Sequence, residues 1–215
     1  MTDMTIEAQT RVREAQILGK PPRLQPVVPE QFTDEMRAVV AKMGKFPHPT
    51  SSGERELAVQ AEDLPEMWLT MLHAPEIYGY HLELAQLFFR GSLPSRDRQL
   101  AILRVAWLCQ APFEWGQHVP LGKQFGISDV EIARVTEGSR APGWSDLDRA
   151  ILRTVEELHK DAMASDETWD ILAAHYDARQ LIELIMLVGQ YQTVAFYQNA
   201  LRVRLKQGNQ GLFAR

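Results

Sequence analysis

The chain has 215 residues, with 28 acidic and 23 basic side chains and a formal net charge of −5. Apolar residues make up 45% of it, close to the average for globular proteins, which argues against a disordered or fibrous chain. No run of Lys or Arg occurs, so we expect neither nucleic acid nor an anionic membrane as a partner.

The cysteine content and the apolar segments bear on the cellular compartment. Cys109 is the only cysteine, so no internal disulfide is possible. The first residues lack the charged and then apolar pattern of a secretory leader, and no apolar stretch reaches membrane-spanning length. We therefore predict a soluble, cytoplasmic protein.

Prolines are frequent in the first fifty residues. Each fixes its own φ angle and disfavours a helical conformation in the residue before it. We predict an extended arm over residues 1–50 that wraps on the body, with one short helix at Asp34–Met43. Residues 51–215 are expected to form a single all-helical domain. The prolines of the arm are Pro21, Pro22, Pro26, Pro29, Pro47 and Pro49.

Helical periodicity dominates from about Leu57 onward, and no alternating strand pattern appears, so the body is predicted to be all-α. The segment that follows Ser95 is apolar on almost every side, which predicts a central helix. The last helix is heavily apolar, and we expect partners to bury it. The predicted helices begin near Pro75, Ser95, Pro112, Ser128, Ser145, Ser165 and Ala178. Of these, Ser95, Ser128 and Ser165 are expected to be N-cap residues, and either Ser145 or Asp146 starts its helix.

The sequence EWGQH places Glu114 and His118 four residues apart on a predicted helix. Residues at this spacing lie one above the other, and Leu121 and Phe125 continue the same stripe toward the core. Desolvation and mutual attraction would then act on both groups, leaving a proton that they can share near neutral pH. This is the property that general acid–base catalysis requires.

Two other interpretations of the pair stay open at this point. A Glu and a His at this spacing also form purely structural ion pairs. Metal binding would need a further ligand, for which His81 is the obvious helper, and no second ligand motif is present, so no metal is expected. Pro120 has no backbone N–H, so the carbonyl of Gly116 lacks its usual helical hydrogen bond and the helix is expected to kink there. The kink either shapes a pocket beside the pair or lets the helix bend around the core.

Two stretches resemble the carboxymuconolactone decarboxylase family, the all-helical group that also contains alkyl hydroperoxidase D. They are SLPSRDRQLAILRVAWLCQAPFEWGQHVPLGKQFGISDVEI and GQYQTVAFYQNALRV. The resemblance covers roughly Pro75 to Leu205. It implies an alkyl hydroperoxidase D-like helical bundle that assembles into trimers or hexamers, with active sites near the subunit interfaces.

The hydroperoxidase branch of that family has a Cys-x-x-Cys pair before a histidine, in which one thiolate attacks the peroxide and the other resolves it as a disulfide. Alignment on His118 places the two cysteines at Ala111 and Glu114. The upstream glutamate of that branch falls at Gln99, which cannot ionise. The dithiol cycle is therefore absent.

The decarboxylase branch keeps the histidine without the cysteine pair, as this chain does. The resemblance implies a cofactor-free lyase or isomerase acting on a small carboxylated or lactone metabolite, with His118 as the acid–base catalyst and Glu114 as its partner. We expect Arg104 to hold an anionic substrate, although it could instead pair with Glu114 or reach solvent. The other residues expected to bind substrate are His81, Trp115 and Tyr191.

Two alternatives to this function remain. One is a peroxidase-like protein that lacks the dithiol, which requires an exposed Cys109 with a depressed pKa. The other is a non-enzymatic helical oligomer that binds a small ligand, with Glu114 and His118 as a structural pair.

Overall fold

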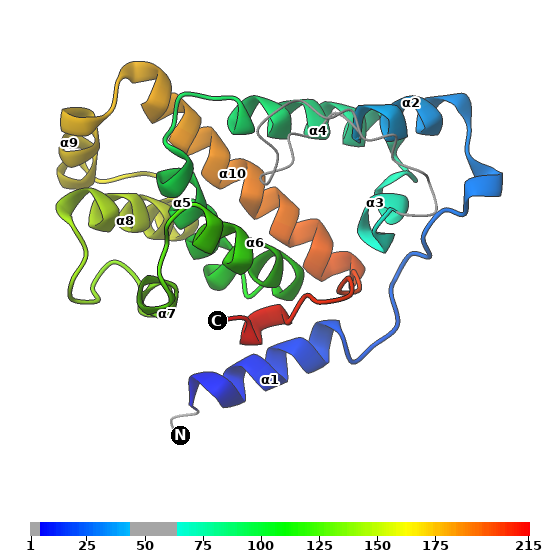
Figure 1. Ribbon diagram of the computed structural model, residues 1–215, viewed down its shortest axis with the longest axis horizontal. Coiled ribbons are helices and arrows are strands. Elements are labelled where there is room, and N and C mark those ends of the chain that lie inside the picture. The colour runs from blue at the N-terminus through cyan, green and yellow to red at the C-terminus, as the bar shows by residue number, and fades with distance from the viewer. Residues whose placement is uncertain (1–4, 44–63) are drawn as a thin grey trace.

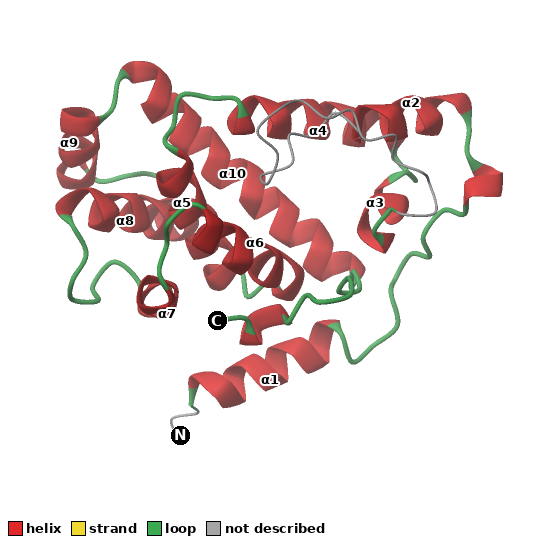
Figure 2. Cartoon of the chain, in the orientation of Figure 1, coloured by secondary structure: helices red, strands yellow, loops and turns green. Residues whose placement is uncertain are grey.

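The computed structural model describes residues 5–43 and 64–215, and all regular elements in these two ranges are helical (Figure 2). The all-α prediction is confirmed over this part of the chain. The α-helices are α1 (Ile6–Ile17), α2 (Asp34–Met43), α3 (Glu66–Met71), α4 (Pro75–Phe89), α5 (Ser95–Leu108), α6 (Pro112–Gln124), α7 (Asp129–Glu137), α8 (Asp146–Asp161), α9 (Asp166–His175) and α10 (Ala178–Leu201). Short 3-10 helices lie at Pro29–Gln31 (η1) and Gly211–Phe213 (η3).

Helix α5 is the centre of the larger hydrophobic core, as its sequence predicts. Every residue from Asp97 to Trp107 is buried, because α5 contacts α6, α7, α8 and α10 on different sides (Figure 1). Ile102 and Leu103 are fully enclosed. Each such aliphatic side chain stabilises the fold by about 1.5–3 kcal/mol relative to an exposed one.

A smaller core lies beside the first and is built from α2, α3, α4 and the segment before α2. It contains Val27, Val39, Tyr78 and Leu82. Helix α4 connects the two cores because it contacts both α2 and α10. The contact between α4 and α10 therefore lies where the smaller core meets the larger one.

Side-chain caps define the starts of several helices. Ser128 and Glu131 form a reciprocal capping box at α7, and Ser145 and Ser165 cap α8 and α9 as predicted. The start of α5 differs by one residue: Pro94 occupies the N-cap position, and the Ser95 hydroxyl accepts a hydrogen bond from Arg98 instead.

The N-terminal arm contains more helix than its prolines suggest. Helix α2 has the predicted bounds, but α1 was expected to be extended and is a 12-residue helix capped by Thr5. It packs beside the C-terminal segment, where the Glu14 carboxylate accepts a hydrogen bond from the backbone of Leu212 (Figure 1). The predicted boundary between residues 50 and 51 lies outside the described residues, as do Pro47 and Pro49.

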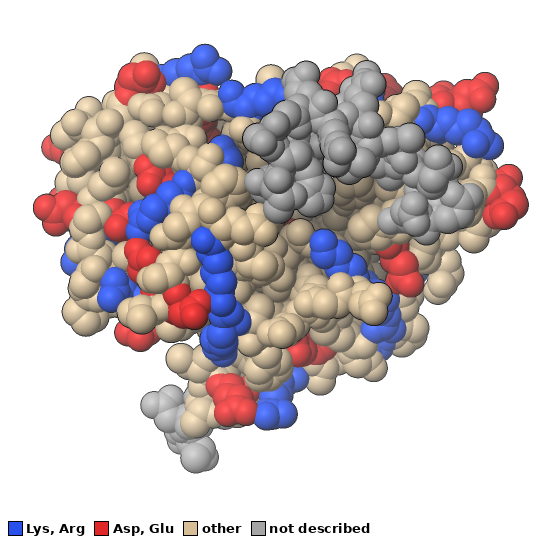
Figure 3. All heavy atoms as spheres, in the orientation of Figure 1, with Lys and Arg blue, Asp and Glu red and all other residues tan. Residues whose placement is uncertain are grey.

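Acidic and basic side chains are interspersed on the face shown in Figure 3. None of the helices in the described ranges is long and apolar enough to cross a membrane. Along α10, Ile182, Met186 and Phe196 remain exposed on the side opposite the core. Assembly with other copies of the chain, which would cover them, stays a prediction.

Candidate active site

A cavity of about 380 Å³ lies between α4, α6 and α10, and residues of α3 and of the segment after α10 also line it. Its walls are largely aromatic and aliphatic, with a few amide, phenol and ionisable groups. Such a composition is typical of small-molecule sites. The lining residues are Pro65, Met67, Trp68, Tyr78, His81, Leu82, Ala85, Phe89, Phe113, Glu114, Gln117, His118, Leu121, Gln190, Tyr191, Val194, Tyr197, Gln198 and Lys206.

Glu114 and His118 lie together on the wall that α6 contributes. The spacing of one helical turn brings Glu114 Oε1 to 3.0 Å from His118 Nε2. The two residues are 3% and 5% exposed. The carboxyl group and the imidazole are thus hydrogen-bonded, shielded from bulk water and in contact with the cavity.

The other ring nitrogen of His118, Nδ1, is hydrogen-bonded to a residue of α5. Gln99 is fully buried, and its Oε1 lies 2.8 Å from His118 Nδ1. Because a carbonyl oxygen only accepts, this contact places a proton on Nδ1. The proton between Nε2 and Glu114 Oε1 is then the one that can move between the two groups.

Helix α10 holds the carboxylate from a third direction. Gln198 Nε2 donates to Glu114 Oε2 at 2.8 Å, and it also contacts Met67 Sδ at 3.2 Å. The ring of Tyr191 stands edge-on to the His118 ring, with centroids 5.3 Å apart. Three helices therefore fix the position of the Glu114–His118 pair.

His81 and Tyr191, both expected to bind substrate, line the cavity. Nδ1 of His81 lies 3.0 Å from Nε2 of Gln190, and the His81 ring stacks on the ring of Tyr78. Burial lowers the pKa of His81, which favours the neutral ring. Burial raises the pKa of Tyr78, Tyr191 and Tyr197, so their hydroxyl groups stay protonated and can donate hydrogen bonds.

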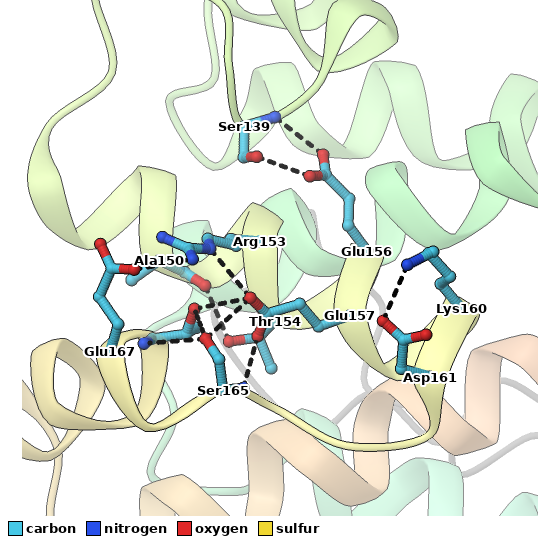
Figure 4. A network of polar contacts seen from close by, with 11 residues as sticks. Ser139, Ala150, Arg153, Thr154, Glu156, Glu157, Lys160, Asp161, Ser165 and Glu167 are labelled. Carbon is cyan, nitrogen blue, oxygen red and sulfur yellow. Dashed lines mark hydrogen bonds and ion pairs between the residues drawn. The ribbon is translucent and has the colours of Figure 1, made fainter.

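Arg104, which was expected to hold an anionic substrate, is not among the residues that line the cavity. Its guanidinium donates to Glu156 at 2.9 Å and to the Val135 carbonyl at 2.8 Å. Gly138 makes room for it, because a Cβ there would collide with the guanidinium. The Glu156 carboxylate also accepts hydrogen bonds from Ser139 (Figure 4). Arg104 thus ties α5 to α7 and α8.

Trp115, which was expected to bind substrate, is also not among the residues that line the cavity. It is fully buried on the core side of α6, packs on Trp107 and donates its Nε1–H to the Ala214 carbonyl. Its position on the helix, one residue after Glu114, directs the ring to another side. Trp115 therefore anchors the C-terminal segment.

Cys109 is half-buried at the end of α5 and is not among the residues that line the cavity. Burial raises its pKa to about 11, so the thiol is protonated near neutral pH. This is opposite to the exposed, acidic thiol that a one-cysteine peroxidase requires.

Sequence patterns did not identify three residues of the site. Gln99 was considered only as the position of a missing glutamate, whereas Gln198 and Lys206 were not considered. Lys206 brings a positive charge to the cavity from the segment after α10. It forms no ion pair with a carboxylate of the described residues. Across residues 5–43 and 64–215, no cluster of three potential metal ligands is present.

Residues 75–157, from the start of α4 into α8, match the model of the carboxymuconolactone decarboxylase family. The match makes this segment of the chain similar to that family. The family segment contains Gln99, Glu114 and His118, whereas Tyr191, Gln198 and Lys206 come from the part of the chain that follows it. No curated protein matches the chain.

Solved structures show that the chain has an AhpD-like fold. A protein of unknown function from Agrobacterium tumefaciens, suggested to be the antioxidant defence protein AhpD, is 21% identical, with a TM-score of 0.59 over 63% of this chain and 94% of its own. A variant of the debrominase Bmp8 in complex with 2,3,4-tribromopyrrole is 13% identical, with a TM-score of 0.66 over 88% and 94%. The AhpD core of a peroxidase-related protein from Ralstonia eutropha JMP134 is also 13% identical, with a TM-score of 0.66 over 87% and 94%.

Proposed function

We propose that the chain is a cofactor-free lyase or isomerase that acts on a small carbonyl or carboxylate compound by acid–base catalysis. The observation that carries this proposal is the contact between Glu114 and His118 in the wall of the cavity. A purely structural ion pair does not require a cavity beside it. The apolar surroundings strengthen the electrostatic interaction of the pair with any charge that develops on a substrate.

The proposed reaction passes through an enolate-like species. Loss of CO₂ from a carboxylate on the carbon next to a carbonyl group, or removal of a proton from that carbon, leaves an electron pair that the carbonyl oxygen stabilises. A proton is then added to carbon, and the proton shared by Glu114 and His118 is the source. In an isomerisation the pair first takes up the proton from carbon and returns it to another carbon.

A peroxidase function has less support from the site. It needs a reactive thiolate, and the only thiol of the chain has a raised pKa and lies outside the cavity wall. Ligand binding without turnover remains the alternative that must be separated from catalysis by experiment.

The experiment that tests the proposed function is deuterium exchange. We expect wild-type protein in D₂O to incorporate deuterium at the carbon beside the carbonyl of at least one member of a panel of 2-oxo acids, β-keto acids and lactones. His118→Asn is expected to lower the exchange rate about 100-fold or more, because it removes one of the two groups that share the proton. Mass spectrometry of the recovered compounds provides the measurement.

His175→Asn is the matched control, since His175 lies on α9 and contacts the backbone of its own helix. It is expected to exchange at the wild-type rate. Binding of a panel compound without deuterium uptake would instead support the ligand-binding alternative.

A second prediction concerns the charge at the cavity. Lys206→Met is expected to weaken binding of a carboxylate-bearing substrate about 5-fold, because a partly exposed cation contributes up to about 1 kcal/mol. Binding of the corresponding amide should change little. Titration calorimetry of both compounds measures this difference, and Lys160→Met on the exposed face of α8 is the control. Equal losses for acid and amide would contradict a charge-specific role for Lys206.

A further inference from the structure

Gln198 is a residue of the cavity wall whose side chain has a hydrogen-bond acceptor without a donor among the described residues. Gln198 is 2% exposed and lines the cavity from α10. Its Oε1 is buried and receives no hydrogen bond from residues 5–43 or 64–215. Leaving a buried acceptor unsatisfied costs free energy, so such an atom requires an explanation.

The orientation of this amide is fixed by its other contacts. Gln198 Nε2 donates to Glu114 Oε2 at 2.8 Å and approaches Met67 Sδ at 3.2 Å. Rotating the amide would place its carbonyl oxygen against the carboxylate, where two acceptors would face each other. The Nε2 group must therefore face Glu114, and Oε1 is the atom left without a donor.

We infer that Gln198 Oε1 accepts a hydrogen bond from a hydroxyl or N–H group of the substrate, beside the carboxylate of Glu114. The inference rests on the proposed function and narrows its substrate class to carbonyl compounds that carry such a donor close to the reacting carbon. An enol or a hydroxyl group on the neighbouring carbon satisfies this requirement. Gln198 then couples recognition to catalysis, because one amide contacts both the substrate and the catalytic carboxylate.

We expect the site to discriminate between ligands that carry a hydrogen-bond donor and analogues that lack it. A site that contains a buried acceptor rejects an analogue that lacks the donor, since binding that analogue leaves the acceptor unpaired. An aromatic donor is a suitable probe for this cavity, whose walls include Trp68, Phe89 and Phe113. The probes are 2-naphthol and its methyl ether, which share the ring system and the oxygen atom; in the ether a methyl group replaces the hydroxyl hydrogen, so the hydrogen-bond donor is lost.

The experiment measures binding of both probes by titration calorimetry. Wild-type protein should bind 2-naphthol about 10-fold more tightly than the ether. In Gln198→Met this preference should disappear, whereas the matched substitution Gln192→Met, on α10 but away from the cavity wall, should retain it. Equal binding of the two probes by wild type, no binding of either, or a preference that persists in Gln198→Met would overturn the inference.

The wild-type comparison alone tests the inference if Gln198→Met fails to fold. These binding measurements require no turnover, so they separate the inference from the proposed function. A preserved preference for 2-naphthol together with no deuterium exchange in any panel compound would contradict the proposed function and leave the role of Gln198 intact.

Discussion

Glu114→Gln is expected to lower the rate of deuterium exchange by at least about 100-fold, and at least as much as His118→Asn does. Both ring nitrogens of His118 already contact protein groups, Nδ1 with Gln99 and Nε2 with Glu114. A carboxylate oxygen has two lone pairs, so the oxygens of Glu114 can still meet a substrate. A glutamine at position 114 keeps the shape of the side chain and removes its ability to carry the proton.

The same measurement on the double variant tests whether the two groups act as one unit. If His118 supplies and stores the proton that Glu114 transfers, Glu114→Gln with His118→Asn should lose little more rate than either single variant. Glu137→Gln, on the exposed end of α7, is the control. Rate losses that multiply in the double variant would indicate that the two residues act independently, contrary to the proposed relay.

The cap signals in the sequence predicted most helix starts correctly because they are local. Ser128, Ser145 and Ser165 each satisfy backbone donors within three residues, so the information lies in one short segment. Helix α1 was not predicted because it buries only Thr10 and Ile17, which gives it little apolar periodicity. Its attachment depends instead on polar contacts to the C-terminal segment.

The candidate site shows the same division between local and long-range information. The Glu114–His118 contact follows from the geometry of a single helix and was predicted from spacing. The contact between Gln198 and Glu114 joins residues 84 positions apart and depends on how α10 packs on α6. A charge in an apolar helix, such as Arg104, must find a partner, but spacing does not identify whether that partner is a substrate or a carboxylate of another helix.

Arg104→Met is expected to destabilise the fold by about 3 kcal/mol, because it leaves the Glu156 carboxylate without its buried counter-ion and the Val135 carbonyl without its donor. Urea unfolding followed by circular dichroism measures this loss. Arg153→Met on the same helix as Glu156 is the control: its ion pairs with Glu157 and Glu167 are more exposed, and about 1 kcal/mol or less is expected (Figure 4).

A double variant separates the structural role of Arg104 from a role in substrate binding. Adding Glu156→Gln removes the uncompensated charge, so Arg104→Met with Glu156→Gln should be less destabilised than the sum of the single changes predicts. Because neither residue lines the cavity, folded protein of each variant should exchange deuterium at the wild-type rate. Wild-type stability combined with lost substrate binding in Arg104→Met would show that the guanidinium reaches the substrate, as the sequence had suggested.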